Sequence, residues 1–297
     1  QLHITGNNLS NQSGLIQTGD NAHLDIVITG ALSNQTGQIH SGADQHIKAS
    51  QVDNSAQGQM TAQGQLTIQS QAELNNQTGQ LIANGLVQLQ GTGIYNDQGQ
   101  IGSLQDQVLV QAGEGSFSNQ SGHLQAKKNI TVEAKHIDNQ KGQINSQEQL
   151  ELKSQQEINN LEGLIAADLG LGLTSQGLNN NQGQIGSAQG AVTLNAGHGV
   201  LSNQTGTILS GQSLKLNAEQ VDNNNQGQIN SQADLQITTA KDISNQAGVI
   251  AANQQITLTS QGLNNAAGQI GSVHAGMMIN SNTGLLNNQS GVIQARD

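Results

Sequence analysis

Acidic side chains come first among the residues that could do chemistry, because two carboxyl groups placed at one bond can hydrolyse a glycoside. Such a pair must converge in one cleft at a separation of roughly 5–9.5 Å. Acids are sparse in this sequence, and there is no Trp to offer a platform for a sugar ring. We therefore predict no catalytic residues and no enzyme activity. The candidates considered are Asp106 with Glu114, Glu148 with Glu151 and Glu157, and Asp234 with Asp242.

Three other aspartates share one position of an internal repeat. They are Asp53, Asp138 and Asp222, and they lie four repeat units apart. If each unit adds about 4.8 Å along an axis, these carboxylates are far from one another. They are therefore not expected to form a catalytic pair.

Histidines are the next candidates, because the sequence has no cysteine and therefore no thiolate ligand for a metal ion. His23 and His46 each precede an aliphatic residue of a predicted strand in neighbouring units, so they are either two exposed imidazoles or two ligands without an evident third. The glycine-rich calcium-binding nonapeptide is missing. We expect no metal and no cofactor. The eight histidines are His3, His23, His40, His46, His123, His136, His198 and His274.

Basic residues are few, and the net charge is −11. The densest group is Lys127, Lys128, Lys135 and Lys141, which we interpret as a solvated face. We predict no nucleic-acid partner, because nothing here would neutralise phosphates. No apolar run reaches the roughly 18 residues that span a bilayer, so no integral membrane segment is expected. The glycine-rich run Leu169–Leu173 lacks the helix that a phosphate loop needs.

A repeated unit of 20–23 residues must position all of these side chains. The clearest copy is LSNQTGTILSGQSLKLNAEQ, which begins at Leu201. An apolar residue opens each unit, Asn follows two positions later, Gly comes after a further three or four, and an aliphatic residue or Met follows the Gly by two. The asparagines are Asn11, Asn34, Asn54, Asn76, Asn96, Asn119, Asn139, Asn160, Asn180, Asn203, Asn223, Asn245, Asn265 and Asn288. The glycines are Gly14, Gly37, Gly58, Gly79, Gly99, Gly122, Gly142, Gly163, Gly183, Gly206, Gly227, Gly248, Gly268 and Gly291.

A second period groups the units in fours, in super-repeats of 84–85 residues. The units that begin at Ile94, Leu178 and Leu263 share GQIGS and carry three extra residues near their ends, which we expect to bulge from one face. The units at Val52 and Val221 carry one extra residue before the Gly.

The apolar pattern within each unit has a period of two, as in Leu214 and Leu216, which is typical of strands. Twenty residues allow three short strands and three bends. The lack of proline and the near lack of aromatic residues favour central strands around a narrow aliphatic core. We predict an all-β, right-handed parallel β-helix of about 14 coils.

The repeated Asn is predicted to be structural, because identical amides in stacked coils fall about 4.8 Å apart and can bond to one another. A stripe that binds sugars or metal ions is the alternative. The Gly that follows is expected at a corner that needs either a positive φ or a close approach.

This unit, with a fixed Asn and Gly and a fixed coil length, resembles the haemagglutinin repeats of filamentous haemagglutinin-like exoproteins. That group includes large adhesins and the CdiA proteins of contact-dependent growth inhibition. The resemblance covers the whole chain. It implies a secreted β-helical stalk at the surface of a Gram-negative bacterium, exported through an outer-membrane two-partner secretion transporter. It also implies that the stalk projects a receptor-binding region and, in CdiA proteins, a toxin region from the bacterial surface. A target-cell or host receptor would then be bound through other regions of the full chain.

The leading interpretation is therefore an extracellular stalk. The alternatives are a carbohydrate-active β-helix enzyme and a repeat surface that itself binds a receptor. Residues 1–297 are expected to form one repeat region, a fragment of a longer solenoid without its natural caps.

Overall fold

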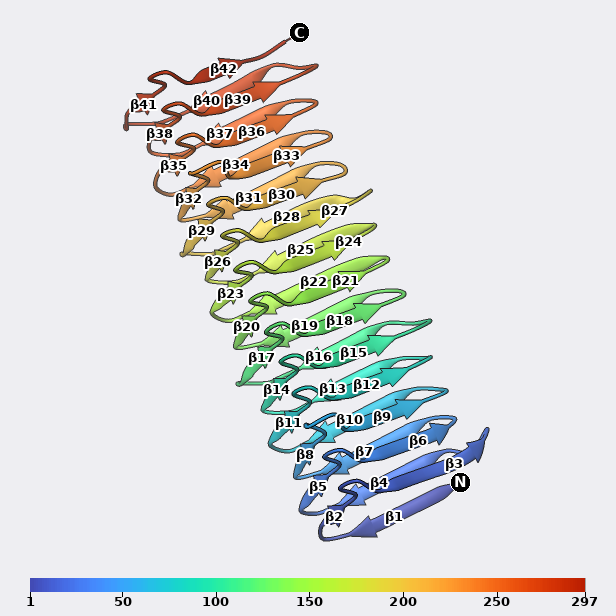
Figure 1. The fold of residues 1–297 in the computed structure, drawn as a ribbon. Helices are drawn as coiled ribbons and strands as arrows, with labels where there is room; N and C mark the ends of the chain where they lie inside the picture. Colours follow the sequence, from blue (N-terminus) through green and yellow to red (C-terminus); the bar gives the residue numbers. More distant parts are fainter. Residues whose placement is uncertain (297) are drawn as a thin grey trace. The chain divides into compact units, whose positions relative to one another are not determined.

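The chain folds into short strands joined by turns. The computed structural model describes residues 1–296, and within them the backbone forms 42 β-strands and no helix (Figure 1). Two compact units divide the chain, Gln1–Gln147 and a second unit that begins at Glu148. The two units have the same internal plan, in which three consecutive strands make one coil and each strand joins a different parallel sheet.

We name the sheets A, B and C in the order in which the chain visits them within a coil. Each strand pairs in parallel with its counterpart in the next coil, with like positions aligned: Leu66 with Val87 in the first unit, and Leu214 with Leu235 in the second. This alignment places identical side chains of neighbouring coils one above another, about 4.8 Å apart.

The first unit has seven strands in each sheet. Sheet A contains β1 (Leu2–Gly6), β4 (Leu24–Ile28), β7 (Gln45–Ala49), β10 (Leu66–Ser70), β13 (Val87–Gln90), β16 (Val108–Gln111) and β19 (Ile130–Ala134). Sheet B contains β2 (Leu9–Ser10), β5 (Ala31–Ser33), β8 (Gln51–Asp53), β11 (Glu73–Asn75), β14 (Gly93–Tyr95), β17 (Ser116–Ser118) and β20 (His136–Asp138). Sheet C contains β3 (Leu15–Asp20), β6 (Gln38–Gly42), β9 (Gln59–Ala62), β12 (Gln80–Ala83), β15 (Gln100–Ser103), β18 (His123–Ala126) and β21 (Gln143–Ser146).

The second unit repeats this arrangement. Sheet A contains β22 (Gln149–Ser154), β25 (Gly170–Thr174), β28 (Ala191–Asn195), β31 (Leu214–Ala218), β34 (Leu235–Thr239), β37 (Ile256–Thr259) and β40 (Met277–Asn280). Sheet B contains β23 (Glu157–Asn159), β26 (Gly177–Asn179), β29 (Val200–Ser202), β32 (Gln220–Asp222), β35 (Ile243–Ser244), β38 (Leu263–Asn264) and β41 (Leu286–Asn287). Sheet C contains β24 (Leu164–Ala167), β27 (Gln184–Ser187), β30 (Thr207–Ser210), β33 (Gln228–Ser231), β36 (Val249–Ala252), β39 (Gln269–Ser272) and β42 (Val292–Gln294).

The core of each unit is a column of aliphatic side chains inside the coils. Burial alternates along the strands, as in β10, where Leu66 and Ile68 are fully buried and Thr67 between them is not. One position breaks the pattern, because Gln45 occupies the place that Leu66 fills in the next coil. Gln45 is fully buried, and in the part of the chain that the structure describes neither its Oε1 nor its Nε2 has a hydrogen-bond partner.

The parallel β-helix of about 14 coils is confirmed, with seven coils in each unit. The extra residues of the bulged coils are placed differently from the prediction. In the coil that begins at Ile94 they are divided between two corners, Leu104–Gln107 after β15 and Ala112–Gly115 after β16. The prediction that these residues bulge from a single face is therefore wrong, because they lengthen two corners that lie at opposite ends of β16. The expectation of one region over residues 1–297 stays a prediction.

Candidate functional site

The corner between sheets B and C contains the repeated asparagine, and we call it the asparagine corner. It runs from the Asn to the Gly, as in Asn203–Gly206. In each coil that is followed by another coil of the same unit, the Asn Nδ2 donates a hydrogen bond of 2.7–2.8 Å to the Oδ1 of the Asn in that next coil. The first unit has one such row and the second has another. The rows are Asn11, Asn34, Asn54, Asn76, Asn96, Asn119 and Asn139, and then Asn160, Asn180, Asn203, Asn223, Asn245, Asn265 and Asn288.

Each amide in a row makes further bonds. Nδ2 of Asn203 also donates to the carbonyl oxygens of Gly206 at 3.2 Å and Gln228 at 3.0 Å, and its Oδ1 accepts from Asn180. The side chain is fully buried. A buried amide is favourable only when its donors and acceptor are used, and here both are. The amide is therefore hydrogen-bonded to the coils on both sides, and the choice between a structural row and a stripe that binds sugars or metal ions stays a prediction.

The repeated Gly is needed because of a close approach. A Cβ at Gly206 would lie 2.6 Å from Oδ1 of Asn203 and still closer to the backbone carbonyl oxygen of Asn180. Its own φ is not positive. The positive φ of the corner falls on the residue before it, such as Thr205 at 53° or Ala267 at 55°. A positive φ or a close approach was expected at this Gly, and the structure shows the close approach.

Two corners are one residue longer and keep the same bonds. In Asn54–Gly58 and Asn223–Gly227 the extra residue adds a second positive φ, at Ala56 with Gln57 and at Asn225 with Gln226. Nδ2 of Asn54 still reaches the Gly58 carbonyl at 3.0 Å and Oδ1 of Asn76 at 2.8 Å. The inserted turns predicted from the sequence are therefore present, and they leave the bonds of the row in place.

The three aspartates at one repeat position close the asparagine corner. Oδ1 of Asp53 accepts the backbone N–H of Ser55 at 3.0 Å, and its Oδ2 accepts the side-chain amide of Gln35 in the preceding coil at 2.8 Å. Asp138 and Asp222 accept a backbone N–H and a glutamine amide in the same way. An Asp that accepts the N–H two residues on is a turn-forming residue. These carboxylates therefore bind the backbone and a neighbouring coil.

The remaining acid pairs lie at different corners. Asp106 precedes β16 and Glu114 follows it, while Asp234 precedes β34 and Asp242 follows it. At about 3.3 Å per residue, the strand between them alone separates the members of each pair by more than about 10 Å. Of the third group, Glu151 forms an ion pair with Lys153 at 3.1 Å. Asp106 with Glu114 and Asp234 with Asp242 therefore lack the spacing that glycoside hydrolysis requires.

The histidines contact side chains of neighbouring coils. Nδ1 of His23 lies 3.3 Å from Oδ2 of Asp44, and Nδ1 of His3 lies 2.7 Å from Oδ2 of Asp25. His46 aligns with Asp25 in the register of sheet A, so His23 and His46 do not stack. Among the described residues no group of three or more His, Cys, Asp or Glu side chains is arranged to hold a metal ion.

The basic residues that are dense in the sequence are dispersed in the structure. Lys127 and Lys128 lie in the corner between sheets C and A, Lys135 in the corner between A and B, and Lys141 in the asparagine corner. Nζ of Lys128 lies 3.2 Å from Oδ1 of Asp106. Residues Leu169–Leu173 belong largely to β25, a strand of sheet A. The lysines therefore do not share one face.

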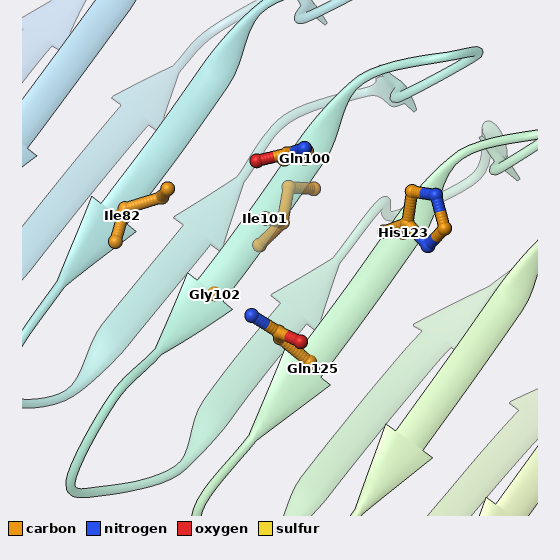
Figure 2. Close-up of a pocket in the computed structure, with 6 residues that line it drawn as sticks. All are labelled: Ile82, Gln100, Ile101, Gly102, His123 and Gln125. Carbon is orange, nitrogen blue, oxygen red and sulfur yellow. The ribbon is translucent and has the colours of Figure 1, made fainter.

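Shallow hollows mark the outer face of sheet C, which the sequence did not reveal. In the first unit a hollow of about 200 Å³ lies over Gly102 and is lined by Ile82, Gln100, His123 and Gln125 (Figure 2). In the second unit a hollow of about 250 Å³ lies over Gly186. Both glycines belong to the GQIGS segment of bulged coils, so this motif was the signal that could have located them.

One phenol is perturbed on the outer face of sheet B. Burial raises the pKa of Tyr95, and the nearby Glu73 carboxylate raises it further. The Tyr95 hydroxyl donates to Oε1 of Glu73 at 3.4 Å. The phenol is thus held protonated beside an acid, as expected for a contact between coils.

These features define a parallel β-helical repeat protein whose recurring polar residues bond one coil to the next. The comparison with curated proteins and the comparison with solved structures gave no match. The haemagglutinin repeat matches four times, at residues 104–167, 156–197, 187–247 and 239–297. Because these matches cover more than half of the sequence, the chain belongs to the haemagglutinin repeat family.

This family is a structural, adhesin-type repeat region, and its members are generally secreted or exposed at the surface. Haemagglutinin repeats fit substrates of two-partner secretion. Within residues 1–296 there is no helix with the length and apolar character needed to cross a membrane.

Proposed function

We propose that this chain is a stalk segment of a large secreted adhesin or of a contact-dependent growth inhibition effector on a Gram-negative bacterium. The observation that carries the proposal is the use of its recurring polar residues. The asparagines bond to asparagines, and Asp53, Asp138 and Asp222 close turns. Amide and carboxylate groups that already form hydrogen bonds between coils or within turns favour a mechanical role over catalysis.

The partners follow from the same proposal. The chain would pass through an outer-membrane two-partner secretion transporter and fold outside the cell. The lack of cysteine is compatible with export as an unfolded chain, because no premature disulfide can form. Recognition of a target-cell or host receptor, and delivery of a toxin where there is one, would belong to other regions of the full protein.

The proposal is tested by shortening the stalk in phase. Deleting residues 178–262 from the second unit removes one super-repeat and joins Gly177 to Leu263, which restores the Gly-Leu-Asn-Asn sequence found at both sites. In the full-length protein displayed on cells, we expect normal export, normal β-sheet content and retained adhesion, with a shorter reach. Deleting 75 of these residues instead would break the coil register, and it serves as the misfolding control.

Two results would contradict a stalk. If the in-phase deletion folds and abolishes adhesion at any cell distance, the repeat surface itself binds the receptor. If the purified chain turns over an oligosaccharide and one acid substitution, such as Asp234→Asn, removes the turnover, the chain is an enzyme.

A further inference from the structure

The outer face of sheet C in the second unit carries no charged side chain. Its seven strands, β24 to β42, contain no Asp, Glu, Lys or Arg within the residues that the structure describes. The other two sheets of this unit do: sheet A has Glu151, Lys153 and Lys215, and sheet B has Glu157 and Asp222. Sheet C is therefore the neutral face of this unit, in a chain whose net charge is −11.

This neutral face contains both a hollow and a projecting apolar side chain. Gly186 leaves the hollow of about 250 Å³, which is also lined by Leu164, Ala166 and Thr207. Leu209, one coil further on, also lines this hollow and is 46% exposed. A projection and a recess therefore lie in adjacent strands of one face, β30 and β27.

Charges flank the neutral face. Asp168 and Asp234 lie in the corners between sheets C and A, and Glu162 lies in an asparagine corner. A neutral centre with a charged border is the usual anatomy of a protein interface. The border is mainly acidic, so it repels an acidic partner that approaches off-centre.

We propose that this face docks a second copy of the same chain, sheet C against sheet C about a twofold axis. A twofold interface must be self-complementary, and a recess beside a projection satisfies this, because each Leu209 can enter the Gly186 hollow of the other copy. Two copies with a charge of −11 repel each other at their charged faces and meet most readily at the neutral one. Face-to-face sheets pack about 10 Å apart, within reach of Leu side chains. This pairing does not depend on the proposed stalk function.

Sedimentation equilibrium of the 297-residue chain tests the pairing with two matched variants. Leu209→Glu places a charge on the neutral face, while Val200→Glu places one on sheet B at a side chain of similar exposure, 44%. We expect the parent chain to dimerise, Leu209→Glu to raise the dissociation constant at least tenfold, and Val200→Glu to change it less than twofold. Thr207→Glu, at the other outward position of β30, is the second variant and should act like Leu209→Glu.

The geometry is tested by small-angle X-ray scattering. A side-by-side pair raises the cross-sectional radius of gyration, whereas an end-to-end pair leaves it unchanged. Circular dichroism checks that each variant keeps its strands. A parent chain that stays monomeric at every concentration overturns the proposal. So does an unchanged cross-section, or an equal effect of Val200→Glu and Leu209→Glu.

Discussion

The asparagine corner and the corner between sheets A and B close the same coils by different means. The asparagine corner has four residues, or five in two coils, and a side-chain row runs through it. The A–B corner varies from one residue, as at Glu219, to five, as at Ser281–Leu285. A 2.7 Å bond between successive amides fixes where the chain must pass. A corner without such a row tolerates extra residues at small cost.

The A–B corner also shows how a bulge is accommodated. The long corners Ala112–Gly115, Ala196–Gly199 and Ser281–Leu285 each turn through a residue of positive φ, which is Gly113, Gly197 or Asn282. Length and sequence can therefore vary here, while the strands on either side keep their register. The A–B corners can therefore change in length and sequence while the core of the coils stays the same.

The largest expected effect comes from breaking the row with a charge. Asn203→Asp removes the donor to Asn223 and places two acceptors opposite each other in a fully buried site. We expect a loss of about 3–5 kcal/mol in the free energy of unfolding at pH 7. Burial raises the pKa of the new carboxyl, so the loss should shrink as the pH falls toward 4, where the group regains a proton. Urea unfolding at both pH values measures this, and Gln236→Glu on the exposed face of β34 is the control, with a change below about 0.5 kcal/mol.

The next effect comes from filling the corner. Gly206→Ala places a Cβ against Asn203 and Asn180, so we expect a loss of about 1–3 kcal/mol. Gly172→Ala is the matched control, because a Cβ there meets nothing within 4 Å. Gly172 lies within a strand, and Ala should stabilise it by about 0.5–1 kcal/mol. Equal losses at the two sites in urea unfolding would show that the corner has no special steric demand.

Replacing the buried amide of Gln45, which has no hydrogen-bond partner among the described residues, should raise the free energy of unfolding, whereas replacing an asparagine of the row should lower it. Gln45→Leu removes two unpaired polar atoms from the core at a position where the next coil has Leu66. We expect the free energy of unfolding to rise by about 1–3 kcal/mol. Thermal unfolding gives the shift in Tm, and a destabilised Gln45→Leu variant would mean that this amide is satisfied in solution.

The smallest effect concerns the backbone of the corner. Ala267 has a φ of 55°, a conformation in which Gly is not disfavoured. Ala267→Gly should stabilise by about 0.5–1 kcal/mol, since relief of the left-handed strain exceeds the added chain entropy. Ala251→Gly, within β36, should destabilise by about 0.5–1 kcal/mol. The two variants should therefore shift Tm in opposite directions, and a fall in both would contradict the strain argument.

The repeat of 20–23 residues was sufficient to predict the parallel β-helix. Apolar alternation, a fixed Asn and Gly, and the lack of proline predicted stacked parallel coils, and the inserted residues at Val52 and Val221 lie at turns as expected. Spacing in the sequence does not give the direction of a side chain at a corner. It therefore could not show that the positive φ belongs to Thr205 and its counterparts, or that Gly206 is needed for contact with the coil before.

Side chains close in sequence were also a poor guide to neighbours in space. Lys128, Lys135 and Lys141 lie on three different corners, because seven residues carry the chain round a third of a coil. The role of Asp53 depends on Gln35 in the preceding coil, 18 residues away, so only the stacked structure reveals it. The hollow over Gly186 likewise needs Leu164 and Leu209 from flanking coils. That the row of asparagines stabilises the fold stays a prediction.

An insertion placed at each of the two corners tests this central claim most directly. Two glycines are inserted after Gln204, within the asparagine corner, or after Glu219, within the A–B corner, and the free energy of unfolding is measured in urea. We expect a loss above about 2 kcal/mol at the asparagine corner, because the bonds of Asn203 are displaced. We expect a loss below about 1 kcal/mol at the A–B corner, where the insertion lengthens the loop beside Glu219 and its half-exposed ion pair with Lys241 but breaks no row of buried amides. Equal losses at the two corners would contradict the view that the asparagine row holds the coils in register.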